Sequence, residues 1–314
     1  MLTAPIVFAS TSAVDVQPSW NLVTDVQLLF AYHFMQNAFL AGTLIALLAG
    51  AVGYFMVLRQ QSFAGHTLAN VGFAGAAGAG LFGWSPFVGL LVFSIGAALG
   101  IGLLSERNTK TQSGQGVAIG TIQTFALSLG LLFVQLFSSY AAGIYTILFG
   151  VVLGISDRDV NAIALTTVVT LAGLVAIARP LLFASVDPDV AEARGVPLRL
   201  LDNAFLVLLA FAVAQAVQVV GVLLIFALLV TPAAIAQQVT ARPGVAVGLS
   251  VILALLFTWA GLAVAYFTPY PVGFFITSFA FGTYGLVRLG RVGHATLARR
   301  TSAGAKDWAD DTYD

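Results

Sequence analysis

Long apolar runs separated by short polar turns dominate the chain from about residue 35 to about residue 290. We expect a membrane span in each of nine runs: 37–58, 66–83, 86–104, 116–137, 158–178, 203–218, 221–240, 245–267 and 272–288. A helix needs roughly 20 apolar residues to cross about 30 Å of hydrocarbon. The runs are continuous rather than alternating, which favours helices over the strands of a barrel. The pattern predicts an all-α, polytopic transmembrane helical bundle with about nine spans (eight to nine).

Two interior segments leave this count open. Residues 139–154 are apolar but short for a span, so a hairpin or a half-helix on the outer side is the alternative. Residues 203–240 form two short spans only if the chain turns near Gln215, Gln218 and Gly221.

The two ends of the chain differ from its middle. The first 30 residues contain no Lys or Arg, which argues against a cleavable signal peptide. We expect residues 1–34 to be an extracytoplasmic arm whose last part, 22–34, is an interfacial amphipathic helix. We expect residues 35–290 to form the transmembrane domain. The polar residues 291–314 end with several aspartates and predict a disordered cytoplasmic tail.

Composition supports a membrane protein and excludes thiol chemistry. Of the 314 residues, 59% are hydrophobic and only 8% are charged, whereas a soluble domain carries about a quarter charged residues. The 32 glycines suit the close approach of membrane helices. Because the chain has no cysteine, disulfides and thiolate metal sites are excluded.

The positive charges predict the orientation. With nine spans, Arg158 alone falls on one side of the membrane. The other side receives Arg59, Arg107, Lys110, Arg179, Arg194, Arg199, Arg242, Arg288, Arg291, Arg299, Arg300 and Lys306. Loops rich in Lys and Arg stay cytoplasmic, so we expect the N-terminus outside and the C-terminus in the cytoplasm.

The longest inner loop contains a short helix whose two ends are both specified by the sequence. Asp187 suits the N-cap, and Pro188 suits the first helical position, where its missing N–H costs nothing. Gly195 can adopt the left-handed conformation that ends a helix, and Pro197 prevents its continuation. Such a segment, 187–195, is either a rigid contact surface or a solvated helix without a partner. Its surface residues are Asp187, Pro188, Asp189, Glu192, Arg194 and Gly195.

This loop also carries a family resemblance. Its pattern Asp-x-x-x-Ala-x-x-x-Gly-(hydrophobic)-Pro-x-x-x-Leu-Asp, ending at Asp202, resembles the coupling helix of membrane permeases from zinc- and manganese-type ABC importers. The segments 35–42, 57–65 and 221–234 resemble the same family, in the same order and spacing. The resemblance implies a homodimer that works with two cytoplasmic ABC ATPase subunits and an extracytoplasmic metal-binding protein. The segment 187–195 would dock into a groove of the ATPase, whose closure switches the permease between outward- and inward-facing states.

A candidate ion site opens the second predicted span. His66 and Asn70 are four residues apart and therefore share one helix face. A neutral imidazole is the commonest protein ligand for divalent ions such as Zn²⁺. The alternative is a histidine that is hydrogen-bonded to a carbonyl of a neighbouring helix.

The resembling family commonly reads Gly-Asp-x-Leu-Ser-His here, with the Asp and His forming the metal site on the permeation path. His66 stands at the place of that Asp, and Asn70 at the place of that His. The resemblance thus implies a transit site at His66 and Asn70, but the pair is neutral and binds a dication more weakly. Weak binding suits transport, because an ion held tightly does not leave. The departure puts the identity of the metal in question.

Other polar residues inside the spans predict interhelical hydrogen bonds, and Gln123 is a further candidate for the pathway. His33 predicts an interfacial residue near the outer surface. The chain has no Gly-x-x-x-x-Gly-Lys-(Ser/Thr) loop, no His-Glu-x-x-His and no Gly-x-Ser-x-Gly motif, so we expect no enzyme activity.

The sequence as a whole predicts the permease subunit of an ABC importer in the cell membrane. It would move a divalent transition metal ion, with zinc or manganese ahead of iron, and would hold no permanent cofactor and bind no nucleic acid. The alternatives are an ABC permease for a metal chelate or another small solute, and a secondary ion transporter. A secondary transporter would be expected to carry an acidic residue inside a span for ion coupling, and no predicted span has one at mid-depth.

Overall fold

A computed structural model describes residue 27 and residues 29–104, 112–136, 148–150, 154–268 and 270–310. All regular secondary structure in these residues is helical. The elements are α2 (His33–Leu58), α3 (Ser62–Gly78), the 3-10 turn η1 (Ala79–Phe82), α4 (Pro86–Leu104), α5 (Gln112–Leu136), α7 (Asp157–Val186), α8 (Pro188–Ala193), α9 (Leu198–Val220), α10 (Val222–Val239), α11 (Pro243–Tyr266) and α12 (Val272–Asp310).

Seven of the described helices are long and apolar enough to cross a membrane: α2, α4, α5, α7, α9, α11 and the part of α12 up to Arg291. The prediction of an all-helical, multi-pass membrane protein is therefore confirmed. The two remaining predicted spans correspond to α3, which has 17 residues, and to α10, where Leu224–Val239 is a shorter apolar helix. The count of eight to nine spans stays a prediction.

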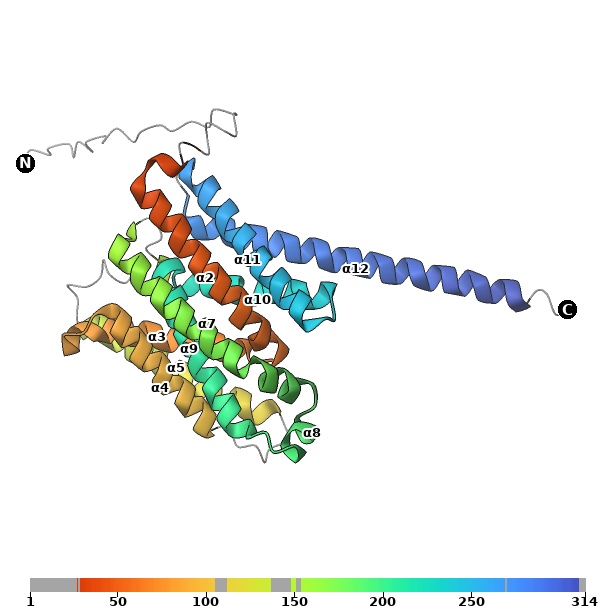
Figure 1. Cartoon of the computed structure of the whole chain (residues 1–314), viewed down its shortest axis with the longest axis horizontal. Coiled ribbons are helices and arrows are strands. Elements are labelled where there is room, and N and C mark those ends of the chain that lie inside the picture. Colours follow the sequence, from red (N-terminus) through yellow and green to blue (C-terminus); the bar gives the residue numbers. More distant parts are fainter. Residues whose placement is uncertain are drawn as a thin grey trace, which may run out of the picture.

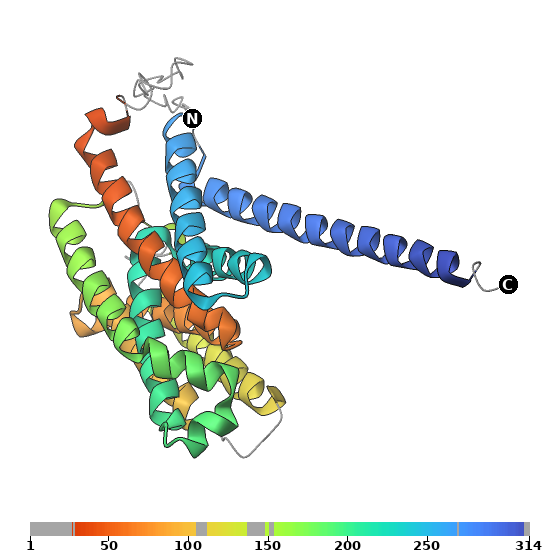
Figure 2. The same cartoon turned by 45° about the vertical axis from the view of Figure 1, so that its right-hand side comes forward.

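The helices α2 and α9 form the centre of the bundle. In the most apolar window of each, 67% of the residues are buried, against 17% in α5 and in α12. The first of these helices packs against α7, α10 and α11, and the second against α4 and α7. On the far side of α9, the helix α3 lies between α4 and α5, whereas α12 leaves the bundle (Figures 1 and 2).

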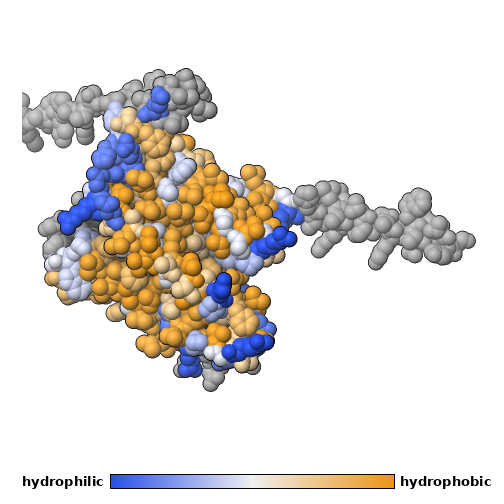
Figure 3. Space-filling view, in the orientation of Figure 1, coloured by the Kyte–Doolittle hydropathy of each residue, from blue (hydrophilic) through white to orange (hydrophobic). Residues whose placement is uncertain are grey.

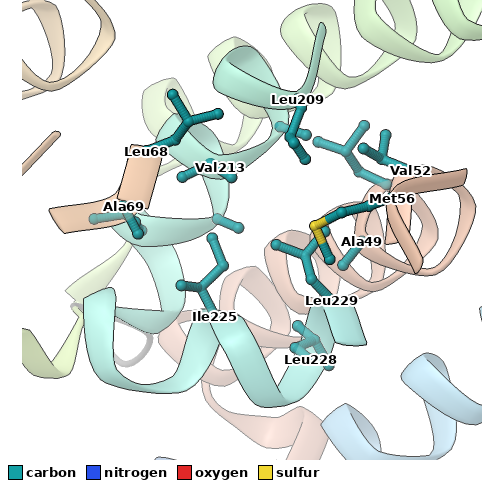
Figure 4. Close-up of a cluster of buried hydrophobic side chains, with 14 of the residues drawn as sticks. Ala49, Val52, Met56, Leu68, Ala69, Leu209, Val213, Ile225, Leu228 and Leu229 are labelled. Carbon is teal, nitrogen blue, oxygen red and sulfur yellow. The ribbon is translucent and has the colours of Figure 1, made fainter. Parts of the chain in front are cut away.

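An apolar cluster joins α2, α3, α9 and α10 near the middle of the bundle (Figure 4). Met56 from α2, Leu68 from α3, Leu209 from α9 and Ile225 from α10 are all buried there. The backbones come very close in this region, since a Cβ on Gly53 would lie 2.1 Å from the carbonyl oxygen of Leu229. The hydrophobic effect does not drive helices together inside a membrane, and small residues let their backbones approach closely enough for van der Waals packing.

Apolar residues cover most of the visible surface, and hydrophilic residues gather toward opposite ends of it (Figure 3). One group lies over the beginnings of α2 and α7, which we call the His33 end. Another lies where α7 and α9 are joined by α8, which we call the α8 end, and a further group lies beside the place where α12 leaves the bundle (Figure 3). This distribution is typical of a protein whose middle faces hydrocarbon.

Several predicted boundaries differ from the structure. Helix α2 begins at His33, so the last two residues of the predicted interfacial helix 22–34 belong to it, and most of the rest lies outside the described residues. Helix α7 continues past Pro180 to Val186, because neighbouring groups in a membrane bundle tolerate a proline. Helix α12 continues to Asp310 where the sequence suggests a disordered tail, and Ala, Leu and Arg are good helix formers there.

The two uncertain segments have different outcomes. The chain does turn at Gly221, which has φ +86° between α9 and α10, so the predicted division of 203–240 is confirmed. Most of 139–154 lies outside the described residues.

Candidate transit site and coupling helix

The burial pattern of α3 singles out the two residues of the predicted ion site. From Ala64 to Gly78 every residue is buried except His66 and Asn70, which are half-buried. Their spacing of four residues places them on one helix face, and Phe63, which is exposed, lies on the same side. The helix therefore has one accessible stripe, and its polar members are Ser62 and the two residues expected from the sequence.

The imidazole of His66 packs against a neighbouring helix, and one of its two nitrogens has no hydrogen-bond partner among the described residues. Its ring meets the ring of Phe226 from α10 edge to face, with the centroids 5.4 Å apart. Its Nδ1 is buried and has no hydrogen-bond partner among the described residues. This nitrogen therefore does not make the hydrogen bond to a helix carbonyl that the alternative interpretation of His66 expects. In the tautomer that carries its proton on Nε2, the Nδ1 lone pair is free to bind a divalent cation.

Gln123 reaches α3 at the position next to His66. The Thr67 hydroxyl donates to the Gln123 side-chain oxygen over 2.8 Å, which joins α5 to α3. Thr67 is fully buried, and Asn70 follows it by three residues. Gln123 therefore contacts the helix that carries His66 and Asn70, through Thr67. Within the described residues no three His, Asp or Glu side chains gather around a point.

The predicted short helix is present as α8 and has the predicted ends. The Asp187 carboxylate accepts from the Val190 N–H over 3.0 Å as the N-cap, and Pro188 occupies the first turn. Gly195 has φ +82°, and its N–H donates to the Glu192 carbonyl over 2.9 Å. The Val196 N–H donates to the Ala191 carbonyl over 3.0 Å and closes the C-terminal end. Local capping therefore determines this helix, as the sequence indicates.

The surface of α8 is open except on one side. Ala191 is fully buried and anchors the helix to the bundle. The six residues of the predicted docking surface are all exposed, as are Val190 and Ala193; the six are Asp187, Pro188, Asp189, Glu192, Arg194 and Gly195. The helix α8 and the accessible stripe of α3 are separate regions of the molecule.

A second polar region lies toward the His33 end. A cavity of about 630 Å³ is lined by residues of α4, α7 and α9, including Arg158, Thr166 and Gln215. Gln215 accepts from Thr167 and donates to Thr170, both over 3.2 Å, so the predicted interhelical hydrogen bonds are confirmed here. His66 does not line this cavity.

Two contacts of the site were missed by sequence reasoning. Phe226 lies within the apolar run 221–234, and its type gives no hint that its ring meets a histidine. Thr67 lies between the two predicted site residues in the sequence, and its hydroxyl donates the hydrogen bond to Gln123. The sequence did contain one indication of this contact, because Thr67 is a polar residue directly beside the candidate ligand His66.

Comparison with known proteins places this geometry in a family. The ABC 3 transport family matches residues 31–287. The manganese import system permease protein ScaB of Streptococcus parasanguinis is 32% identical over 242 residues, which cover 77% of this chain and 85% of ScaB. The high-affinity zinc uptake system membrane protein ZnuB of Haemophilus influenzae is 27% identical over 242 residues, which cover 77% of this chain and 92% of ZnuB.

A solved structure agrees with these relatives. A chain of PsaBC from Streptococcus pneumoniae in complex with Fab superimposes with a TM-score of 0.75 at 28% identity, covering 85% of this chain and 95% of that chain. The match to the family extends over α2 to α11 and most of the membrane part of α12. The resemblance found in the sequence is confirmed, and the chain belongs to the ABC 3 transport family.

Proposed function

We propose that this chain is the permease subunit of an ABC importer that moves a divalent transition metal ion, zinc, manganese or iron, into the cytoplasm. A separate ATPase subunit powers it. The observation that carries the proposal is α8, a helix fixed at both ends and exposed along its docking residues in a chain of the ABC 3 transport family. The names of ScaB and ZnuB support manganese and zinc as cargo.

The α8 end faces the cytoplasm in this proposal. Ser185, near the end of α7, and Asp202, near the start of α9, both contact Arg59 at the end of α2, so these three helix ends lie together. Positive charges concentrate in the loops at this end, as the positive-inside rule requires for a cytoplasmic face. The N-terminus is then outside, where a metal-binding protein delivers the ion, and two copies of the chain form the importer.

The ion passes the accessible stripe of α3. His66 supplies an imidazole nitrogen and Asn70 an amide oxygen, both available to borderline divalent ions. The site has no carboxylate of its own, so it offsets only part of the cost of removing water from the ion. Such a site suits passage rather than storage.

Transport by the chain together with its ATPase tests the proposal. The complex is reconstituted in liposomes that contain a metal-sensitive dye, and Mn²⁺ or Zn²⁺ uptake and ATP hydrolysis are measured in parallel. We expect ATP-dependent uptake, a roughly tenfold loss of uptake in His66→Ala, and little change in Val175→Ala, an exposed apolar residue of α7. Uptake that is independent of ATP would contradict an ABC importer, and full uptake by His66→Ala would remove His66 from the path.

The docking role of α8 has its own test. Reversing the charges of Glu192 and Arg194 together should abolish ATP-dependent uptake, because both are exposed on the docking surface. Arg242→Ala, which removes an exposed charge from another loop, is the control. Wild-type coupling after the reversal would contradict the docking assignment.

A further inference from the structure

We propose that Arg59 is a positioning residue that joins the docking helix α8 to the transit helix α3 and carries the movement of one to the other. This inference rests on the proposed function. It is argued from the contacts of one side chain, which touches both chain segments that flank α8 and stands at the turn that leads into α3.

The guanidinium of Arg59 contacts residues of two other helices, Ser185 of α7 and both Asp202 and Phe205 of α9. Its Nη2 donates to the Asp202 carboxylate in an ion pair. Its Nη1 donates to the Ser185 hydroxyl over 3.1 Å. Its carbon lies 5.9 Å from the centre of the Phe205 ring, within the range of a cation–π contact. A planar fork of donors can hold two acceptors and a ring at once, which a lysine cannot.

These partners bracket α8. Ser185 precedes Pro188 by three residues, and Asp202 follows Ala193 by nine. A displacement of α8 must move at least one of the two flanking segments, because the helix is only six residues long and is bounded by an N-cap and a left-handed glycine. Arg59 holds both segments and therefore responds to either.

The other side of the connection is the turn from α2 to α3. Arg59 is the C-cap of α2, and Gln60 has φ +57°, which makes it the one non-glycine residue with positive φ among the described residues. The Gln61 N–H donates to the Met56 carbonyl over 2.9 Å, and the Gly65 N–H donates to the Gln61 carbonyl over 3.1 Å. The turn is thus short and hydrogen-bonded at both ends, so a shift of Arg59 reaches the first turns of α3. His66 lies seven residues after Arg59.

Burial separates Arg59 from the other arginines of the chain. Its side chain is 11% exposed, and among the arginines whose side chains the structure describes it alone is not classed as exposed. Orientation in the membrane needs only positive charge in a cytoplasmic loop, and an exposed arginine provides that. A largely desolvated guanidinium held by a carboxylate, a hydroxyl and a ring has a single arrangement. A change in that arrangement is a discrete event, as transmission between two sites requires.

The test compares the number of ions moved per ATP hydrolysed, which a merely structural role would not change in the folded complex. Asp202→Asn keeps the shape of the side chain and removes the charge. We expect the complex to assemble and hydrolyse ATP while the ratio of ions to ATP falls roughly tenfold, within the usual range of coupling between sites. The matched control is Arg199→Gln, an exposed residue one turn earlier on α9, which should keep the wild-type ratio.

Reversing the charges of Arg59 and Asp202 is the decisive experiment. Arg59→Glu alone should uncouple the complex, and Arg59→Glu with Asp202→Arg should recover a large part of the ratio. If Arg59→Glu does not fold, Asp202→Asn and Ser185→Ala still report the ratio in assembled complex. An unchanged ratio in Asp202→Asn, or uptake and hydrolysis that fall together with the amount of folded complex, overturns the inference. Absence of ATP-dependent uptake in the wild type would instead overturn the proposed function.

Discussion

The two ends of α2 are each tied to other helices by a charged contact, and the two contacts differ in burial. At the α8 end Arg59 pairs with Asp202, and their side chains are 11% and 34% exposed. At the His33 end the His33 Nε2 lies 3.0 Å from an Asp157 carboxylate oxygen, and their side chains are 70% and 66% exposed. Water and salt screen the second pair strongly, and the first much less. The end that is proposed to transmit movement therefore has the contact that solvent weakens less.

The polar residue that matters at the His33 end is the buried one. Asn37 is 6% exposed, and its side-chain N–H groups donate to the Asp157 carboxylate over 2.7 Å and to the Ile155 carbonyl over 3.2 Å. Its amide thus joins the start of α2 to the start of α7. The comparison teaches that burial, rather than formal charge, determines which contacts hold these helix ends together.

The largest predicted effect on stability comes from breaking the buried pair. Asp202→Ala leaves the Arg59 guanidinium without its carboxylate in a setting that is largely out of water. Loss of one partner of a fully buried pair costs about 3–5 kcal/mol, and the partial exposure of Asp202 reduces our expectation to roughly 2–3 kcal/mol. Equilibrium unfolding in mixed micelles measures it. A loss as small as that of an exposed surface substitution would remove the contrast between the two ends.

A smaller effect at the α8 end is expected from the backbone alone. Gly195 has φ +82°, and a Cβ built on it meets nothing within 4 Å, so Gly195→Ala adds conformational strain without a clash. The expected loss is about 1 kcal/mol, with weaker binding of the ATPase subunit because the end of α8 changes. Gly244→Ala is the matched control, since that glycine is helical and also open. It should be neutral or slightly stabilising, and equal effects at both glycines would contradict the proposed strain.

The sequence predicts α8 residue by residue but not the contacts of Arg59, and the reason is physical. Capping of α8 by Asp187 and Gly195 involves groups within a few residues of one another, so the local pattern contains it. Arg59 and Asp202 are 143 residues apart, and their pairing depends on how α2, α7 and α9 pack. The charge of Arg59 served only to orient the spans in the sequence-based reasoning.

The same distinction holds for the candidate ion site. Helix periodicity places His66 and Asn70 on one face, and the structure makes that face the accessible one on α3. The contact of His66 with Phe226 joins residues from α3 and α10, so no local pattern contains it. The span count stays a prediction, since α3 has 17 residues and Leu224–Val239 of α10 is shorter than the helices that are long enough to cross a membrane.

The smallest effect, and the sharpest control, is expected at the His33 end. His33→Ala removes one partner of an exposed pair, while Asn37 keeps its hydrogen bond to the same carboxylate. We expect unfolding in mixed micelles to be nearly unchanged, and the small residual difference to disappear when the salt is raised from about 0.05 M to about 0.5 M. Asn37→Ala in the same assay should be clearly destabilising and insensitive to salt, because its partners lose a buried donor. A His33→Ala effect as large as that of Asn37→Ala would mean that exposed charge, and not burial, holds this end of α2.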